Sequence, residues 1–244
     1  MSQIEDKYKD ITCFVYCGGK CGGCTLKKTL KQYYTVLGLH NNSDFCERMN
    51  FHQNYSIYDV IEYNRKTQEK IYIIDSYRMP IERKMSSFFQ NIIKYLPNYK
   101  NQTLKSIIKH FNINMIYNLE EYHPIDEIMN HYGLPTFETF DFKKGYNLLV
   151  HENIHFIKIK FNDINNWSTI LSSIFNRPIK IQSDNVSELK EYNDVYNKFK
   201  EVYYLPNLYY KNYLPNDKNF KIYNTKEEQE AYYAKWAKRL LPNM

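Results

Sequence analysis

The sequence lacks the features that place a chain in a membrane or outside the cell. None of its apolar runs approaches the ~18 residues that cross a bilayer as a helix. The first ten residues, MSQIEDKYKD, are charged and contain no apolar stretch of the kind that a signal peptide needs. We therefore expect a cytoplasmic protein with no membrane partner.

Cysteine is scarce and unevenly placed. The chain has five cysteines, and four of them, Cys13, Cys17, Cys21 and Cys24, crowd one segment. A secreted disulfide framework would have an even number of cysteines spread along the chain. The cysteine usage therefore favours a reducing compartment.

The chain also lacks concentrated charge. It has 33 Lys and Arg residues against 27 Asp and Glu residues, a net charge of +6, without a basic run or an RNA-binding motif. We expect no nucleic-acid partner. A mild positive charge favours anionic ligands such as nucleotides, phosphates or acidic sugars, although it is also typical of a plain solvated surface.

What is present is an alternation of short apolar strands and helices. ITCFVYC (11–17) and EKIYIIDSYR (69–78) are apolar runs typical of buried strands, and DFCERMNFHQN (44–54) is expected to contain another. CTLKKTLKQYYTVLGL (24–39) and PIERKMSSFFQNIIKYL (80–96) have apolar residues at helical spacing.

The second half of the chain continues this alternation and then becomes helical. YNLLVHENIHFIKIKFND (146–163) is expected to form one or two strands, NNWSTILSSIF (165–175) a helix, and the tyrosine-rich C-terminal third more helices. Such an order predicts an α/β fold with a central, mainly parallel sheet and a helical C-terminal region. With no internal repeat or disordered linker, we expect one domain over residues 1–244.

Three segments are candidate sites, and the first is the cysteine triplet. Cys17, Cys21 and Cys24 have the C-x₃-C-x₂-C spacing with which radical-SAM enzymes bind an iron–sulfur cluster. Gly23 stands where those loops place an aromatic residue, and no Gly-Gly-Glu motif follows. Small buried cysteines that line a turn are the favoured interpretation.

The second candidate is HENIH (151–155), which matches the zinc motif H-E-x-x-H. Two histidines four residues apart bind zinc only when the segment is helical. Here the flanking residues alternate with period two, which predicts a strand, a tight turn at Glu152–Asn153 and a second strand. We therefore expect no metal site.

The third candidate is a pair of anion sites. GGKCGGCTL (18–26) lies between a predicted strand and a predicted helix. Its glycines let backbone N–H groups curl around a phosphate at the helix N-terminus, and Lys20 and the hydroxyl of Thr25 add donors. The segment is not a Walker A motif, because no G-K-[ST] occurs.

The next predicted strand and helix repeat the arrangement with different chemistry. Arg78 leaves the strand, Pro80 starts the helix, and Ser86 lies eight residues after Arg78. Ser86 is thus expected on a helix face that could share one anion with Arg78, while Arg83 is available nearby. The carboxyl ends of adjacent parallel strands are where open α/β sheets bind nucleotides.

These two segments resemble the cofactor motifs of PAPS-dependent sulfotransferases. KCGGCTL (20–26) is similar to the family's K-[ST]-G-[GST]-[ST]-[ST]-L loop, which holds the 5′-phosphosulfate. YRMPIERKMSSFF (77–89) is similar to its R-D-P-x-x-R-x-x-S-x-[FY] segment, which holds the 3′-phosphate. More loosely, the C-terminal third resembles a bacterial and viral group associated with capsular polysaccharide synthesis.

The resemblance implies a P-loop-like three-layer fold whose cofactor-binding half is 11–90 and whose acceptor side is 91–244. It implies transfer of a sulfuryl group from PAPS to a carbohydrate or similar hydroxyl, with PAP as product. Lys20 would stabilise the leaving phosphate, and His52 would be the base. The residues implied to bind the cofactor are Gly22, Gly23, Cys24, Thr25, Leu26, Arg78 and Ser86.

Two departures from the family motifs keep other functions open. Cys24 replaces a hydroxyl residue, and Met79 replaces the Asp that usually follows the arginine. The alternatives are a P-loop-like nucleotide-binding protein or kinase and, less favoured, a radical-SAM enzyme. No motif names the acceptor or the oligomeric state.

Overall fold

The chain forms two compact units in a computed structural model that describes residues 4–48, 55–118, 124–182 and 191–241. Unit 1 comprises Met1–Arg78 and Tyr122–Asn185, and unit 2 comprises Met79–Glu121 and Val186–Met244. Each unit has buried apolar clusters of its own. The functional division after residue 90 stays a prediction, whereas the division into compact units falls after Arg78.

Unit 1 is built on a five-stranded sheet of order β2-β1-β3-β5-β4. Its strands are β1 (Cys13–Tyr16), β2 (Val36–Leu39), β3 (Ile71–Tyr77), β4 (Tyr146–His151) and β5 (Ile154–Lys160). The first three pair in parallel, as do β3 and β5, and only β4 is antiparallel to its neighbour. The predicted α/β class with a mainly parallel central sheet is therefore confirmed.

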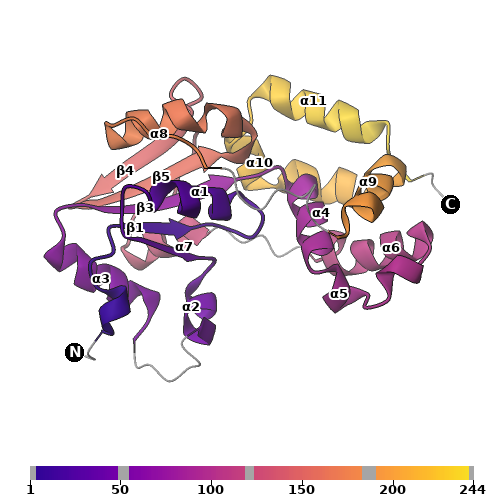
Figure 1. Cartoon of the computed structure of the whole chain (residues 1–244). Coiled ribbons are helices and arrows are strands. Elements are labelled where there is room, and N and C mark those ends of the chain that lie inside the picture. The colour runs from indigo at the N-terminus through magenta and orange to yellow at the C-terminus, as the bar shows by residue number, and fades with distance from the viewer. Residues whose placement is uncertain (1–3, 49–54, 119–123, 183–190, 242–244) are drawn as a thin grey trace. The chain divides into compact units, whose positions relative to one another are not determined.

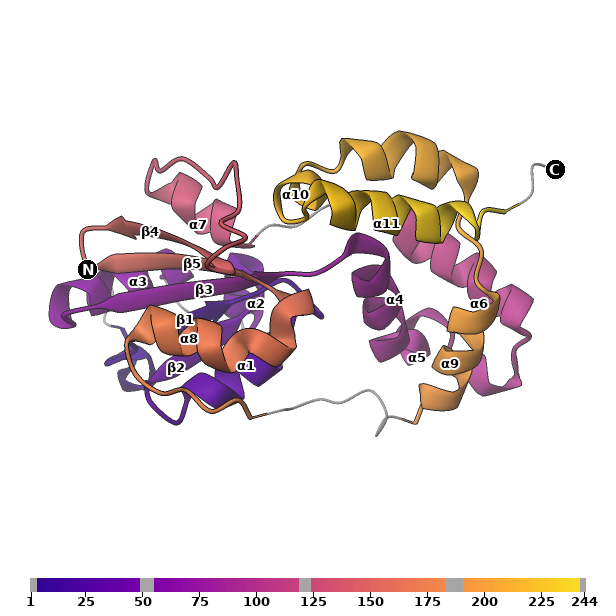
Figure 2. The same ribbon diagram turned by 90° about the horizontal axis from the view of Figure 1, so that it is seen from above.

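Helices cover both faces of this sheet, which makes three layers (Figures 1 and 2). The helical segments of unit 1 are η1 (Asp6–Tyr8), α1 (Gly23–Leu30), α2 (Asn42–Arg48), α3 (Ile57–Thr67), α7 (Pro124–His131), η4 (Phe161–Asn166) and α8 (Trp167–Phe175). Residues of α1 and α8 share one buried cluster with the sheet, and residues of α2, α3 and α7 share the other. We call these the α1/α8 face and the α3/α7 face.

The local sequence explains most of these elements. β3 is buried along nearly its whole length, as its continuous apolar run predicted for a strand covered on both faces. Ser56 caps α3, accepting from the Asp59 amide while the Asp59 carboxylate accepts from the Ser56 amide. Within the described residues, no helix has both the length and the apolar character needed to cross a bilayer.

In the first third of the chain, one predicted helix is too long and one predicted strand is helical where it is described. The helix expected over 24–39 ends at Leu30, and a turn leads into β2. Thr35 and Val36 are β-branched and favour the extended backbone that pairs with β1. Of the segment 44–54, where a strand was expected, residues 44–48 belong to α2, and Asn41 accepts a hydrogen bond from the Asp44 amide at its start. Residues 49–54 lie outside the described residues.

The predicted hairpin at HENIH is confirmed. β4 and β5 pair antiparallel with His151 opposite Ile154, and Glu152 and Asn153 form the connecting turn. Glu152 has a φ of 51°, the left-handed backbone that a two-residue hairpin turn needs. The two histidines therefore lie on strands rather than on one helical face.

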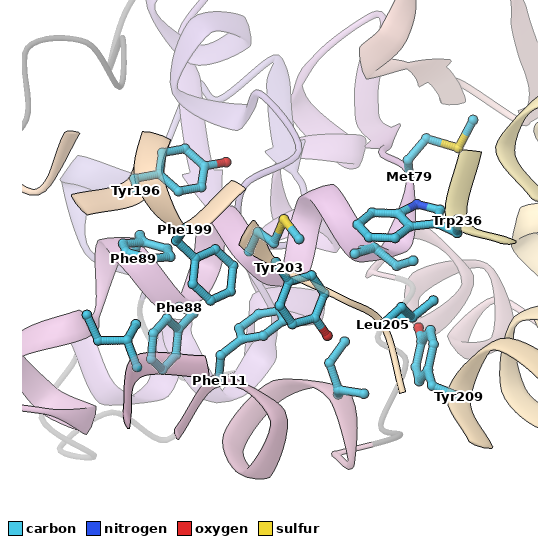
Figure 3. Close-up of a cluster of buried hydrophobic side chains, with 14 of the residues drawn as sticks. Met79, Phe88, Phe89, Phe111, Tyr196, Phe199, Tyr203, Leu205, Tyr209 and Trp236 are labelled. Atoms are coloured by element: carbon cyan, nitrogen blue, oxygen red, sulfur yellow. The ribbon is translucent and has the colours of Figure 1, made fainter. Parts of the chain in front are cut away.

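Unit 2 is helical in its described parts. Its segments are α4 (Pro80–Gln90), α5 (Ile92–Tyr95), η2 (Tyr99–Asn101), α6 (Leu104–Phe111), the π-helical η3 (Asn112–Ile116), α9 (Asn193–Val202), the π-helical η6 (Tyr209–Tyr213), η7 (Leu214–Asn216), α10 (Lys218–Ile222) and α11 (Lys226–Ala237). Aromatic side chains from several of these helices meet in one core, which Figure 3 shows around Phe199 and Tyr203. The helical C-terminal region is thus confirmed.

Candidate functional site

Residues 18–22 lie in the loop between β1, which pairs with β2 and β3 in the sheet, and α1. The Cys17 amide donates to the Leu39 carbonyl at 3.1 Å, which extends the β1–β2 pairing to the start of the loop. A turn follows, closed by a bond of 3.3 Å from the Cys21 amide to the Gly18 carbonyl. The Leu26 amide then donates to the Gly22 carbonyl at 3.0 Å, and α1 has begun. We call residues 18–22 the glycine loop.

Gly22 is required at its position for two reasons. Its φ is 86°, in the left-handed region that side chains disfavour. A Cβ atom there would also lie 2.6 Å from Cη2 of Trp167 and 2.9 Å from Cδ2 of Phe161. Both aromatic rings therefore lie directly against the backbone of the glycine loop. Lys20 has a φ of 68°, so the loop contains a second left-handed residue.

Arg78 ties the end of β3 to the glycine loop. Its Nη1 donates to the Lys20 carbonyl at 2.8 Å, and its guanidinium carbon lies 4.4 Å from the centre of the Phe161 ring. Phe161 in turn contacts the position of Gly22. The guanidinium therefore fixes the main chain at Lys20 and stacks on the ring that lines the same loop.

The topology places these residues where open α/β sheets bind ligands. The connection after β1 runs through α1 on the α1/α8 face, whereas the chain that follows β3 returns to unit 1 as α7 on the opposite face. Adjacent strands whose connections diverge leave a crevice at their carboxyl ends. Lys20 and Arg78 follow the carboxyl ends of these two strands, β1 and β3.

A buried ion pair lies near the carboxyl end of the same sheet. Lys158 Nζ is 2.5 Å from Asp75 Oδ2, and the two side chains are only 3% and 1% exposed. Asp75 also accepts from the Ser76 amide at 2.7 Å. The hydroxyl of Ser76 is buried and has no hydrogen-bond partner among the described residues. Ser76 follows Ile74 by two residues in β3, so its side chain lies on the same side of the sheet as Ile74, the α1/α8 face.

The α3/α7 face contributes a carboxylate and two tyrosines near the end of β1. Glu127 Oε1 accepts from the hydroxyl of Tyr16 at 3.2 Å and from that of Tyr58 at 2.5 Å. The ring of Tyr58 stacks on His131 with centroids 4.0 Å apart. Burial, followed by the bond to Glu127, raises the pKa of Tyr58. No local motif points to this cluster, because its members come from three distant segments.

His40 is a second group that the sequence did not single out. It directly follows β2, and its Nδ1 lies 2.7 Å from the carbonyl oxygen of Cys17, the residue before the glycine loop. Its amide donates to Asp44 Oδ2 at 2.9 Å, and its side chain is exposed. The only available signal was its place between the two anion motifs.

The structure does not bring the three motif cysteines together as a set of metal ligands. Within the described ranges, no group of three or more His, Cys, Asp or Glu side chains is placed to hold a metal ion. Cys17 and Cys21 are buried and Cys24 is exposed, all as free thiols. Burial raises the pKa of Cys17 well above its usual range, and the nearby Asp75 charge acts in the same direction. Cys17 and Cys21 agree with the interpretation of small buried cysteines that line a turn, whereas Cys24 is exposed in the first turn of α1.

The other predicted cofactor residues fall into two groups. In α1, Gly23 lies close to the side chain of Cys17, and Thr25 is buried. Leu26 lies in the core, and its amide donates a hydrogen bond to the Gly22 carbonyl. The structure thus gives Leu26 a packing role. Ser86 lies half-buried on α4, which belongs to unit 2, so its proposed partnership with Arg78 stays a prediction.

His52, the predicted base, lies outside the described residues. The comparisons with known proteins add no assignment to this geometry. No protein-family model, no curated protein and no solved structure matches the chain.

Proposed function

We propose that the chain binds a phosphorylated nucleotide at the glycine loop and is a PAPS-dependent sulfotransferase acting on a hydroxyl of a carbohydrate or similar acceptor. One observation carries the proposal: the hydrogen bond from Arg78 to the Lys20 carbonyl at the carboxyl ends of two adjacent parallel strands. It joins the two segments that resemble the family's phosphate-binding motifs. A P-loop-like fold is part of the same proposal.

The residues at the loop fit an anionic group. Gly22 lets the main chain pass close to aromatic rings, which a Cβ would prevent, and the first turn of α1 directs its N–H groups toward the loop. Lys20 and Arg78 bring two positive charges to the carboxyl end of the sheet. The buried hydroxyl of Ser76 adds a polar atom on the α1/α8 face.

When bound, PAPS supplies the sulfuryl group that is transferred. The residues of the chain then bind and orient the cofactor and stabilise the charge that develops during transfer. The ammonium of Lys20 stabilises the negative charge that develops on the leaving phosphate oxygen. The bond from Arg78 keeps the main chain of Lys20 fixed, so that the charge is held in place before the reaction.

The surroundings of Met79 and Cys24, the two residues that depart from the family motifs, bear on cofactor affinity. Met79 is buried in the aromatic core of unit 2, so an apolar side chain suits the position where the family has Asp. Cys24 is exposed in the first turn of α1, and a thiol there is a weaker hydrogen-bond donor than a hydroxyl. The proposal therefore includes a cofactor affinity lower than a hydroxyl residue would give.

Titration calorimetry with PAP tests the proposal. We expect the wild type to bind PAP, and Lys20→Ala and Arg78→Ala each to weaken binding about 10-fold or more, since each removes a charge-assisted contact. Lys28→Ala is the matched control, because Lys28 is an exposed lysine on α1, and should change affinity by less than about twofold.

Three outcomes would count against this function. The wild type could bind no PAP, or Lys20→Ala could bind it as tightly as the wild type. Alternatively, ATP or GTP could bind more tightly than PAP. This last result would favour the nucleotide kinase or nucleotide-binding alternative on the same loop.

A further inference from the structure

We infer that His40 is the residue that takes the proton from the acceptor hydroxyl, an inference that rests on the proposed function. The sulfuryl transfer needs a base, because the attacking oxygen starts as a hydroxyl and ends as a sulfate ester. The ring of His40 hydrogen-bonds to the carbonyl of Cys17, the residue that directly precedes the glycine loop.

The position of His40 is fixed by main-chain hydrogen bonds on both sides. The Cys17 amide donates to the carbonyl of Leu39, and the Cys17 carbonyl accepts from the ring of His40. The amide of His40 is held by Asp44 at the start of α2. The imidazole is thus anchored to the last residue before the loop that carries Lys20.

The same hydrogen bond defines the tautomer of the ring. A carbonyl oxygen can only accept, so at 2.7 Å the proton must be on Nδ1 of His40. The neutral ring then has its lone pair on Nε2, the nitrogen on the opposite side of the ring from Cys17. The side chain is exposed, so this basic nitrogen can be reached by a hydroxyl acceptor.

Other candidate bases are less suited. Glu127 already accepts two tyrosine hydroxyls on one oxygen, which holds that carboxylate within its own cluster. Asp75 is buried and paired with Lys158. The ring of His131 is held against the ring of Tyr58, with centroids 4.0 Å apart.

The proposed step balances in atoms and charge. The acceptor oxygen forms its bond to sulfur while Nε2 of His40 takes the hydroxyl proton. The bond between sulfur and the 5′-phosphate oxygen breaks, and its electron pair leaves with PAP. Lys20 stabilises the charge on that leaving oxygen, so the two residues act at opposite ends of the transferred group.

The first test separates the base from its anchor. In His40→Asn, an amide N–H can replace Nδ1–H toward the Cys17 carbonyl, but no basic nitrogen remains. With radiolabelled PAPS and either water or desulfated glycosaminoglycans as acceptors, we expect transfer to fall about 100-fold or more while PAP affinity stays within about twofold. His110→Asn, on α6 of unit 2, is the matched control and should keep wild-type transfer.

The second test needs no activity. Long-range proton–nitrogen spectra of the histidine-labelled wild type, in alkaline buffer where imidazoles are neutral, report each ring tautomer. The chain has seven histidines, and the signal lost in His40→Asn, or in His40→Gln if the first variant does not fold, identifies His40. We expect the Nδ1-protonated form.

The outcomes distinguish this inference from the function on which it rests. An Nε2-protonated His40, or a folded His40→Asn protein with full transfer in an active wild-type background, overturns the role of His40 and leaves the sulfotransferase proposal standing. A wild type that neither binds PAP nor transfers sulfate overturns the function and this role together.

Discussion

The two units bury charge in different ways. In unit 1 the buried lysine Lys158 pairs with the carboxylate of Asp75 inside the sheet, close to the ends of the strands. In unit 2 the buried lysine Lys84 donates to the main-chain carbonyls of Met115, within the π-helical η3, and of Asn118, two residues after η3. The first arrangement places opposite charges in the core. In the second, the lysine supplies hydrogen bonds to main-chain carbonyls at the end of a helical segment.

The difference indicates a division of labour. In unit 1, Asp75, Lys158 and Arg78 lie close to the carboxyl ends of parallel strands, which is where an α/β sheet binds ligands. Unit 2 fills its core with aromatic rings and gains its order from packing. We therefore expect substitutions in unit 1 to change both stability and ligand binding, and substitutions in the core of unit 2 to change stability alone.

The largest effect is expected from breaking the ion pair of unit 1. Lys158→Met leaves the carboxylate of Asp75 buried without its cation, and should lower the free energy of unfolding by about 3–5 kcal/mol. The double variant Asp75→Leu/Lys158→Met removes both charges and should recover most of that loss. Urea unfolding followed by circular dichroism measures both. Equal losses of unfolding free energy in the single and double variants would show that the unpaired charge of Asp75 is not the cause of the destabilisation.

A similar effect is expected in the core of unit 2. Phe199 is fully buried against Phe89, Phe111 and Tyr203, so Phe199→Ala should cost about 3–5 kcal/mol of unfolding free energy. Tyr204→Ala is the control, since Tyr204 is 46% exposed, and should cost less than about 0.5 kcal/mol. At a temperature where Phe199→Ala remains folded, its PAP affinity should equal that of the wild type. A large loss of affinity would refute the division of labour.

An intermediate effect is expected at the glycine loop. Gly22→Ala combines a left-handed backbone with a clash against Trp167, and should cost about 2–4 kcal/mol and abolish PAP binding. Gly133→Ala provides the comparison, because Gly133 has a φ of 65° and no atom within 4 Å of an added Cβ. Gly133→Ala should lower the free energy of unfolding by only about 1 kcal/mol, the cost of a left-handed backbone, and leave PAP binding intact. Thermal unfolding with and without PAP gives both quantities, and identical losses would mean that the aromatic contact is unimportant.

The smallest effects come from two capping boxes, one in each unit. Ser56→Ala in α3 and Thr225→Ala in α11 should each lower stability by about 1 kcal/mol, because each leaves an amide at a helix start unpaired. Amide hydrogen exchange resolves where each loss occurs. We expect Ser56→Ala to speed exchange in unit 1 and Thr225→Ala in unit 2. If either variant speeds exchange equally in both units, the two units unfold together as one cooperative unit.

The sequence was sufficient for the elements with strong local patterns. The apolar run of β3, the proline at the start of α4 and the alternation of β4 and β5 each determine their element from neighbouring residues. It was not sufficient for α1 and β2, because apolar spacing continued past Leu30 while the end of the helix was set by the pairing of Val36 with β1.

The site was predictable to a similar extent. The glycine loop and Arg78 carry local motifs, and the structure joins them by a hydrogen bond. The contacts of Phe161 with Gly22 and of His40 with Cys17 depend on which strands are neighbours in the sheet. With β2 predicted as part of a helix, nothing in the sequence could bring His40 to the end of β1.

Amide hydrogen exchange in the presence of PAP tests the central claim, that the ligand binds at the glycine loop of unit 1. We predict that saturating PAP slows exchange in peptides covering 17–26 and 72–78 and leaves peptides from α11 unchanged. Lys20→Ala should remove that protection, whereas Lys28→Ala should retain it. Protection confined to unit 2, or none in 17–26 at saturating PAP, would contradict the account.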